Sequence, residues 1–485
     1  MAVAISLPNL GLNDDEQRLV GQMRSRIGRY ARKNQRKQDF YEAKQKITHL
    51  DIAVPPQLRE LAVACGWPGT VVDVLEERLD WLGWATNNDD ALGLDDIYRD
   101  NHLGLESSRA HTDALIVGTD FIAVGKGDES TGEPEVLVTV ESPSSCTAIW
   151  NYRTRRNDAA LSQTRDEHGH VVLESLYLPN ATIRFERGPG KKLAVVDRDD
   201  HGLGRVPVAR MRNRDRASDL EGRSEITRPI RYYTDAACRT LLGLEINREF
   251  YTAPQRYALG ADPEQFGVGE NSSPHERIMA GWNAAMGRLN IVPRDEDGEL
   301  PEMGQFPSNP PTPYVEQLRV YSQFVSSESG IPSPYLGFVT DNPPSADAIR
   351  QAEFRLVKRA ERRQASFGMA WREVAFLSLL VRDKKVDPEV FRRIYVNWRD
   401  ASTPTRSATA DEALKLVTAG VLLPDSRVTY DRIGLAPQDQ EKLEEEKRRN
   451  RVAAVVRNLP AAGAAARQDP DVASAVSAQG TADAE

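Results

Sequence analysis

The sequence predicts an α+β fold that is mainly helical. Apolar residues recur at helical spacing from Ala346 to about Val381 without a proline, which is typical of one long helix. Between Asp120 and Val196 the period of apolar residues changes to two, and Gly, Asp, Asn and Pro separate the short runs. That change predicts a small antiparallel β meander embedded between helical segments.

Length and charge limit the possible classes of protein. A chain of 485 residues exceeds one ordinary core, so two or three domains are expected. The net charge is −9, whereas a protein that grips phosphates tightly shows a basic excess. Contact with DNA is therefore expected to be local or weak.

Membrane and redox signals are also informative. No run approaches the ~18 apolar residues of a membrane span, and the first residues lack the pattern of a secretory signal. Cys65, Cys146 and Cys238 are far apart and lack metal or redox spacing. They are expected to be reduced, structural thiols.

The N-terminal third reads as helices followed by strands. Residues 14–48 predict a helix with a basic run, which could touch nucleic acid but is interpreted by preference as a solvated face. A short amphipathic helix is expected to end near Gly83, and another runs from Leu94 to Val117 with Gly118 as its C-cap. The predicted strands are Phe121–Val124, Val136–Val140, Cys146–Tyr152, Val171–Leu178, Thr182–Glu186 and Leu193–Val196.

Two further helices flank a long excursion. Gly222–Tyr251 and about Tyr314–Ser329 carry helical apolar stripes. Residues 252–313 are rich in proline and glycine, with weak strand signals at Gln255–Leu259 and Arg288–Val292. Such a length is too great for a plain loop, so a small projecting module is predicted.

The long helix is preceded by a loop and followed by a helical set. Four prolines between Pro332 and Pro344 prevent regular structure before Ser345. After the long helix come Val386–Trp398, a Ser/Thr/Pro break, and helical segments at Ala410–Ala419, Asp425–Ile433 and Pro437–Val456. The tail, 457–485, is rich in alanine and predicted to be disordered.

The sequence contains no recognised catalytic motif. A phosphate-binding loop, a nucleophile elbow and a zinc-protease pair are all absent. His168 and His170 lie in a polar turn, and Asp197, Asp199, Asp200 and His201 read as a hydrated acidic turn rather than a cation site. No catalytic residue, metal site or cofactor is therefore assigned, and the chain is not expected to be an enzyme.

Four segments follow one another along the chain: ALIVGTDFIAVG (Ala114–Gly125), LGRVPVARMRNR with GRSEI (Leu203–Ile226), SPYLG…NPPSADAIR (Ser333–Arg350) and ADEALKLVTAGVLLPDSRVTYDRIGL (Ala410–Leu435). In this order they resemble the SPP1-like portal family of tailed double-stranded DNA bacteriophages. No single motif is decisive, but their order and spacing are specific.

The resemblance implies a portal-type subunit with wing, stem, clip and crown, and a long kinked helix. The implied parts are the wing (1–221), stem helices (222–251 and 314–329), clip (252–313), tunnel loop (330–344), long helix from wing to crown (345–383) and crown (384–456).

By the same resemblance, the chain forms a ring, expected to be a dodecamer, at one capsid vertex. The ring would be the channel for packaging and ejection of double-stranded DNA. Its other partners would be the terminase large subunit, the head–tail adaptor, the major capsid protein and a scaffold, with no membrane. The protein would be assembled in the host cytoplasm and reside in the virion.

Two groups of candidate site residues follow. The tip of the implied tunnel loop consists of Phe338, Val339, Thr340, Asp341 and Asn342; the alternative for Phe338 is packing into a subunit interface. A basic stripe on the long helix consists of Arg355, Lys358, Arg359, Arg362 and Arg363. Pairing with acidic residues of the same or a neighbouring subunit is favoured over contact with DNA.

Two other interpretations remain open at this stage. A Mg²⁺-dependent nucleic-acid-processing enzyme would use scattered carboxylates and would be a monomer or dimer. Another virion connector or minor head protein would form rings but would not need the helix–excursion–helix arrangement of residues 222–329.

Overall fold

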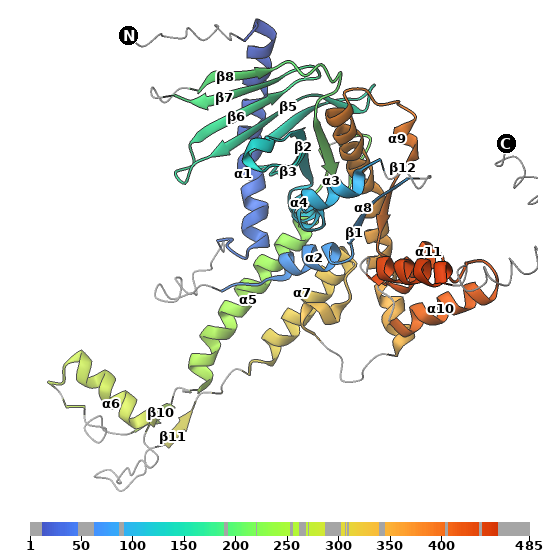
Figure 1. The fold of residues 1–485 in the computed structure, drawn as a ribbon. Helices are drawn as coiled ribbons and strands as arrows, with labels where there is room; N and C mark the ends of the chain where they lie inside the picture. Colours follow the sequence, from blue (N-terminus) through green and yellow to red (C-terminus); the bar gives the residue numbers. More distant parts are fainter. Residues whose placement is uncertain are drawn as a thin grey trace, which may run out of the picture. The chain divides into compact units, whose positions relative to one another are not determined.

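The structure is a computed structural model of the chain. It describes residues 12–46, 63–86, 92–188, 193–219, 221–252, 256–260, 268–269, 271–286, 302–305, 307, 310–338, 345–402, 406–435 and 439–453. The chain divides into two compact units, Met1–Ser402 and Thr403–Glu485, and Figure 1 shows the order of their elements.

The α-helices are distributed along the whole chain. They are α1 (Asp14–Tyr41), α2 (Trp67–Glu76), α3 (Leu94–Asp100), α4 (Leu103–Val117), α5 (Arg228–Thr252), α6 (Pro274–Met286), α7 (Thr312–Ser329), α8 (Ala346–Asp383), α9 (Val390–Arg393), α10 (Arg406–Thr418) and α11 (Arg427–Ile433). Short 3-10 helices, η2 (Glu129–Thr131) and η4 (Ser333–Leu336), lie in two of the connections.

The strands concentrate between α4 and α5. They are β1 (Trp81–Thr86), β2 (Thr119–Lys126), β3 (Val136–Glu141), β4 (Cys146–Asn151), β5 (Arg156–Arg165), β6 (Val171–Tyr177), β7 (Thr182–Arg187), β8 (Leu193–Asp199), β9 (Val208–Arg212), β10 (Arg256–Leu259), β11 (Glu302–Gln305) and β12 (Ile394–Trp398).

The meander is confirmed, but the segment forms two sheets instead of one. Strands β4 to β8 make a five-stranded antiparallel sheet in sequence order, while β3, β2 and β9 make a separate three-stranded sheet. The sequence does not predict strands β5 and β9. Strand β5 is rich in polar and charged residues, and its buried stretch includes Ser162 and Gln163 as well as Ala159, Ala160 and Leu161.

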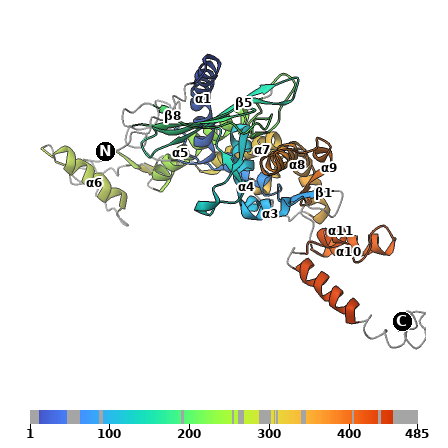
Figure 2. The same ribbon diagram turned by 45° about the horizontal axis from the view of Figure 1, so that its top comes forward.

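Helix α1 covers the five-stranded sheet. A capping box starts the helix, since the Asn13 side chain accepts from the Glu16 amide and the Glu16 carboxylate accepts from the Asn13 amide. Val20, Met23 and Ile27 form a buried cluster with residues of β5, β6 and β7, and Figure 2 shows α1 beside this sheet. The helix ends at Tyr41 rather than at 48, because Ala43 has a positive φ of 54°.

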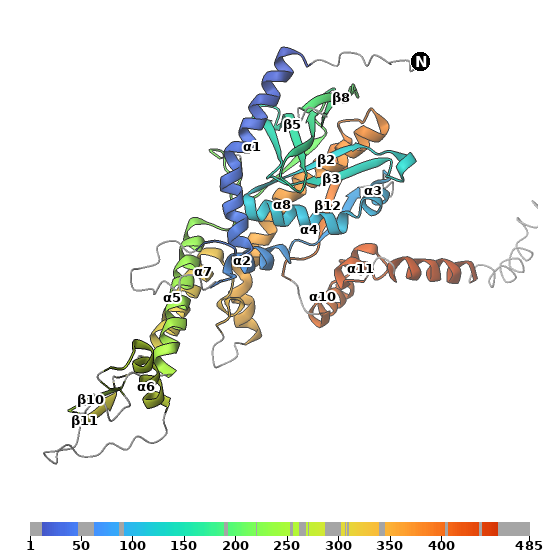
Figure 3. The ribbon, with the colours of Figure 1, turned by 90° about the vertical axis from the view of Figure 1, so that its left-hand side faces the viewer.

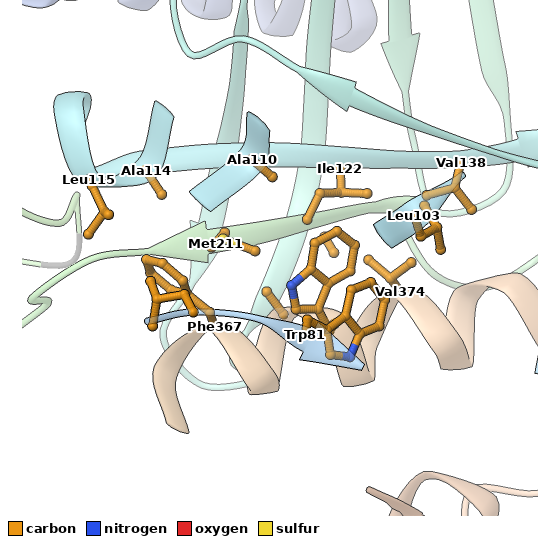
Figure 4. Close-up of a cluster of buried hydrophobic side chains, with 14 of the residues drawn as sticks. Trp81, Leu103, Ala110, Ala114, Leu115, Ile122, Val138, Met211, Phe367 and Val374 are labelled. Atoms are coloured by element: carbon orange, nitrogen blue, oxygen red, sulfur yellow. The ribbon is translucent and has the colours of Figure 1, made fainter. Parts of the chain in front are cut away.

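The main core of the first unit lies between α4, the three-stranded sheet and α8. Figure 4 shows Ala110 and Leu115 of α4, Ile122 of β2, and Phe367 and Val374 of α8 in this cluster. These side chains are buried, so α8 is an internal element of this unit over much of its length.

A tryptophan cluster fixes α8 within that core. Trp81 stacks on Trp371 at a ring distance of 4.1 Å, and Trp84 Nε1 donates to the Trp371 carbonyl over 2.9 Å. Trp81 and Trp84 belong to β1, which pairs with β12. The predicted helix up to Gly83 is therefore wrong beyond Glu76, because this aromatic segment pairs as a strand with a partner some 310 residues later in the sequence.

The predicted helix from Leu94 to Val117 is two helices, α3 and α4. It breaks at Asn101 and His102, where His102 has a positive φ of 50°. The Asn101 side chain instead bonds to the backbone of β3, donating to the Val136 carbonyl and accepting from the Val138 amide, both over 2.8 Å. Gly118 is the C-cap of α4, as predicted.

Helices α5 and α7 lie side by side and are separated in sequence by the predicted excursion (Figure 1). Within it, β10 pairs with β11, and α6 lies between them in sequence. Helix α5 starts at Arg228 rather than Gly222. The second predicted strand, Arg288–Val292, lies outside the described residues, and the observed partner of β10 is Glu302–Gln305.

The long helix is confirmed as α8, a continuous helix of 38 residues that begins after the N-cap Ser345. The Ser345 hydroxyl accepts from the Ala348 amide over 3.2 Å. From Leu356 onward its apolar side chains are buried or half-buried in the chain's own core, except Ala365, which is exposed, and Met369, which is 55 % exposed. Ile349 and Phe354, in its first turns, are 46 % and 66 % exposed.

The second unit is helical and has a small core. It contains α10, α11 and a helical segment at 439–453 that Figure 2 shows after α11. Among its described apolar residues, Ala413 and Tyr430 are buried, whereas Leu414, Val421 and Leu423 are largely exposed. The predicted disordered tail, 457–485, lies outside the described residues.

Candidate functional site at the start of the long helix

Three of the predicted site residues, Arg355, Arg359 and Arg363, lie where α8 meets the end of α7 and the segment before α5. Helix α7 ends at Ser329, with Gly330 as its C-cap at a positive φ of 74°. A Cβ on Gly330 would lie 3.3 Å from side-chain atoms of both Arg355 and Arg359. The absence of a side chain therefore lets α8 approach the end of α7 closely.

Two arginines of α8 bind the C-terminal carbonyl groups of α7. Arg355 Nη1 donates to the Ser327 carbonyl over 2.7 Å, and Arg359 Nη1 donates to the carbonyls of Glu328, over 3.2 Å, and Ser329. The carbonyl end of a helix carries a partial negative charge, which guanidinium groups stabilise. These contacts fix the start of α8 to the end of α7.

A buried carboxylate completes the junction. Glu225, fully buried just before α5, accepts from Arg359 and from Arg363 Nε, the latter over 3.2 Å, while Arg214 lies 3.4 Å away. Burial alone would raise the pKa of Glu225, but the charges of Arg359, Arg363 and Arg214 lower it below the ordinary value of 4.5. Glu225 is therefore ionised at neutral pH.

Residues in or next to β9, α5 and α7 add further hydrogen bonds around Glu225. The Asn213 side chain donates to Glu225 Oε1 over 3.1 Å and accepts from Arg363 Nε over 3.1 Å. The Thr227 hydroxyl, at the start of α5, donates to Glu328 in α7 over 3.1 Å. One hydrogen-bonded network thus joins β9, α5, α7 and α8.

The basic stripe is not one surface. Its five positions span about 140° of the helix circumference at 3.6 residues per turn. Arg355, Arg359 and Arg363 contact the same chain as described above, whereas Lys358 pairs with Glu361 on the exposed side over 2.6 Å. Arg362 is exposed and has no carboxylate within 4 Å among the described residues.

The described part of the predicted loop, up to Phe338, is anchored at two positions. Tyr335 donates its hydroxyl to Glu353 of α8 over 2.7 Å, and Arg78 pairs with the same carboxylate over 3.2 Å. Phe338 is half-buried against a cluster of Cys65, Ala237, Cys238 and Leu318. The other four proposed tip residues, Val339, Thr340, Asp341 and Asn342, lie outside the described residues.

Sequence reasoning missed Glu225 and Asn213 as members of this site. Both lie in segments quoted for the family resemblance, but a buried acid and an exposed one look alike in a single sequence. Their role depends on α8, which follows more than 120 residues later. The long-range contact is the information that the sequence pattern does not contain.

The remaining chemistry of the described residues is sparse. No three His, Cys, Asp or Glu side chains in the described ranges are placed to hold a metal ion. His168 and His170 lie in an exposed turn, and the three cysteines are buried and free. Among the described helices, none is long and apolar enough to cross a membrane.

Comparison with known proteins gives consistent matches over most of the chain. Residues 26–451 match the family model described as "Phage portal protein, SPP1 Gp6-like". The portal protein of Mycobacterium phage D29 is 33 % identical over 413 residues, which cover 83 % of each chain. The portal protein of Mycobacterium phage L5 is 32 % identical over 413 residues, covering 83 % of this chain and 82 % of the relative.

The chain also resembles solved structures of gene transfer agent particles. A chain in the neck of the empty particle has a TM-score of 0.44 at 12 % identity, covering 76 % of this chain and 90 % of that one. A chain in the neck of the native particle, computed with C12 symmetry, has a TM-score of 0.42 at 12 % identity with the same coverage.

Proposed function

Because the chain belongs to the family of SPP1 Gp6-like phage portal proteins, we propose that it forms a ring at one capsid vertex, through which double-stranded DNA enters and leaves the virion. The observation that carries this proposal is the family match, which extends over 26–451 and includes every described helix of the first unit except the first turns of α1. The role is structural rather than enzymatic.

The parts of the chain can be assigned to parts of the ring on this basis. We assign α5 and α7 to the stem, the excursion between them to the clip, and the helices after Ser402 to the crown. This crown starts later than the 384 that the resemblance implies, because β12 pairs with β1 in the first unit. The clip would bind the terminase large subunit and the head–tail adaptor. The helix–excursion–helix order, which another connector protein would not need, supports the portal assignment.

Net charge and the position of the arginines fit a channel that does not hold DNA. The chain has an excess of nine negative charges, which keeps attraction for phosphates small. Three of the five cations of the basic stripe are bonded to Glu225 or to carbonyl groups of α7. They stabilise the base of the proposed tunnel loop instead of being available to bind phosphates.

Microscopy of the purified protein tests the ring directly. We expect rings with an axial hole, and we expect Phe354→Asp to give folded protein without rings. Phe354 is 66 % exposed at the start of α8, and burial of one phenylalanine contributes about 1.5–3 kcal/mol at each subunit contact. Tyr152→Asp, at a residue 76 % exposed in the turn after β4, is the matched control and should still form rings. A monomeric wild-type protein would contradict the proposal.

The tunnel loop is tested separately by replacing residues 339–342 with a Gly-Ser segment while keeping Phe338. We expect normal rings, because the network around Glu225 and the packing of Phe338 remain. DNA packaging should fall when the variant complements a phage that lacks its own portal protein, measured as encapsidated DNA. A wild-type amount of encapsidated DNA would show that residues 339–342 have no role in the movement of DNA.

A further inference from the structure

One face of α1 carries cations that make no ion pair in the described part of the chain, although Lys33 lies over the Tyr30 ring and Arg36 over the Phe40 ring. Residues 24–38 contain seven Lys and Arg and no Asp or Glu. Arg24 pairs with Glu174, Arg26 pairs with Glu221, and the Lys37 ammonium donates to the Val117 carbonyl. The other four form the basic surface: Arg29, Arg32, Lys33 and Arg36, all exposed and without a carboxylate within 4 Å in the described part of the chain.

An acidic surface lies around α3 and the connection before β3. Asp95, Asp96 and Asp100 are exposed on α3, and Arg99 pairs with Asp96 over 3.1 Å. The connection contributes Glu129, Glu133 and Glu135, also exposed. The Asn101 side chain, at the end of α3, bonds to Val136 and Val138 at the start of β3, which directly follows this connection. The two groups of carboxylates therefore belong to neighbouring elements, and together they are called the acidic surface.

Helix α4 separates the two surfaces. Its C-terminal carbonyl at Val117 accepts from Lys37 of α1, and its N-terminus at Leu103 follows directly on α3 and Asn101. Its 15 residues span about 22 Å. Figure 3 shows α1 and α3 at opposite ends of α4. The basic and acidic surfaces are therefore on opposite flanks of the same rigid body.

We propose that the basic surface of one copy contacts the acidic surface of the next copy around the ring. This inference rests on the proposed ring, which requires head-to-tail contacts between two different surfaces of identical chains. Opposite charges on opposite flanks meet this requirement. They also disfavour wrong pairings, because two basic surfaces repel each other and two acidic surfaces do the same. Complementary charge of this kind guides association and fixes orientation more than it adds affinity.

Nucleic acid is the other partner that a row of exposed cations on a helix could bind. A second copy is favoured because the chain itself presents the matching carboxylates, at the far end of α4. If the basic surface bound nucleic acid, changes in the acidic surface would not affect assembly. If it binds a second copy, they would slow assembly.

Charge reversal with compensation tests the inference on the full-length protein. We expect Arg29→Glu with Arg32→Glu to slow ring assembly about tenfold or more at low salt, and Glu129→Lys with Glu135→Lys to do the same. Combining all four changes should restore the rate toward that of the wild type. Among the described residues, none of these four side chains makes a hydrogen bond or an ion pair, so folding should be unaffected. Mass photometry against time measures the rate.

Matched controls separate this inference from the proposed function. Arg153→Glu with Arg393→Glu makes the same change in net charge as Arg29→Glu with Arg32→Glu, but at two exposed arginines outside both surfaces, and it should assemble normally. An unchanged assembly rate in either charge-reversed variant would overturn the proposed charge contact. Failure of the combined variant to recover the wild-type rate would also overturn it. Neither result would contradict the proposal that the protein forms a ring. Loss of DNA binding by the α1 variant with unchanged assembly would overturn it in favour of nucleic acid. A monomeric wild type would contradict both.

Discussion

Replacing Glu225 with glutamine is expected to lower the free energy of unfolding by about 3–5 kcal/mol. The carboxylate is fully buried and is the common partner of Arg214, Arg359 and Arg363. Without its charge, two arginines that are themselves largely buried keep their positive charges and lose their compensating partner. Urea denaturation of wild type and variant, followed by tryptophan fluorescence, measures the difference.

The matched control is Glu361→Gln in α8, the helix that carries Arg359 and Arg363. Glu361 pairs with Lys358, but both side chains are about half exposed, and exposed pairs contribute about 0–1 kcal/mol. Equal effects of the two substitutions would show that the junction does not depend on Glu225. An unchanged midpoint for Glu225→Gln would contradict the network as described.

The Glu225 carboxylate also makes the free energy of unfolding depend on pH. Its pKa in the folded state is below the ordinary value of 4.5, so its contribution is fully present above pH 4.5 and is lost as the pH falls through the folded-state pKa. The Glu225→Gln variant lacks this titrating group. The difference in stability between wild type and variant is therefore expected to shrink as the solution is acidified below pH 4.5.

Replacing Gly222 with alanine is expected to destabilise the protein by about 4 kcal/mol or more, a size seen only for a few mechanisms. Gly222 has a φ of 80°, and a Cβ there would lie 1.9 Å from the backbone oxygen of Gly118. The segment that follows carries Arg223, whose amide donates to the Asn213 carbonyl over 2.7 Å, and then Glu225. Displacing Gly222 therefore displaces the buried carboxylate as well.

The Gly132→Ala variant is the control that separates the steric clash at Gly222 from the strain of a positive φ, which both positions share. Gly132 has nearly the same φ, 85°, but nothing lies within 4 Å of its Cβ position. Its replacement should cost only the strain of a left-handed residue, about 1–2 kcal/mol. Soluble yield and thermal unfolding measure both variants. Similar losses at the two positions would show that the contact between Gly222 and Gly118 has no effect on stability.

The elements that sequence predicted well are those whose pattern is local and long. The apolar spacing of α8, the Ser345 start and the Gly330 end of α7 are determined within a few residues of each feature. The predicted order of helix, excursion and helix is confirmed by α5, β10–β11 and α7 for the same reason.

The errors share a different cause, which is dependence on distant residues. Trp81–Thr86 is a strand because Ile394–Trp398 pairs with it. The Leu94–Val117 pattern breaks because the Asn101 side chain satisfies the backbone of β3. The basic stripe divides because α7 ends beside Arg355 and Arg359. Each of these partners lies far away in the sequence, so the local spacing of apolar residues contains no information about it.

Helix α8 joins the network around Glu225 to the tryptophan cluster by one unbroken rod. Trp371 follows Ala346 by 25 positions, or about 38 Å along the axis at 1.5 Å per residue. An α-helix of this length transmits displacement as a stiff lever, since its backbone hydrogen bonds lie nearly parallel to the axis. A push on the segment before Ser345 would therefore reach the tryptophans as a tilt or a thrust of the whole helix, and mechanical load at the loop would be borne by the aromatic core.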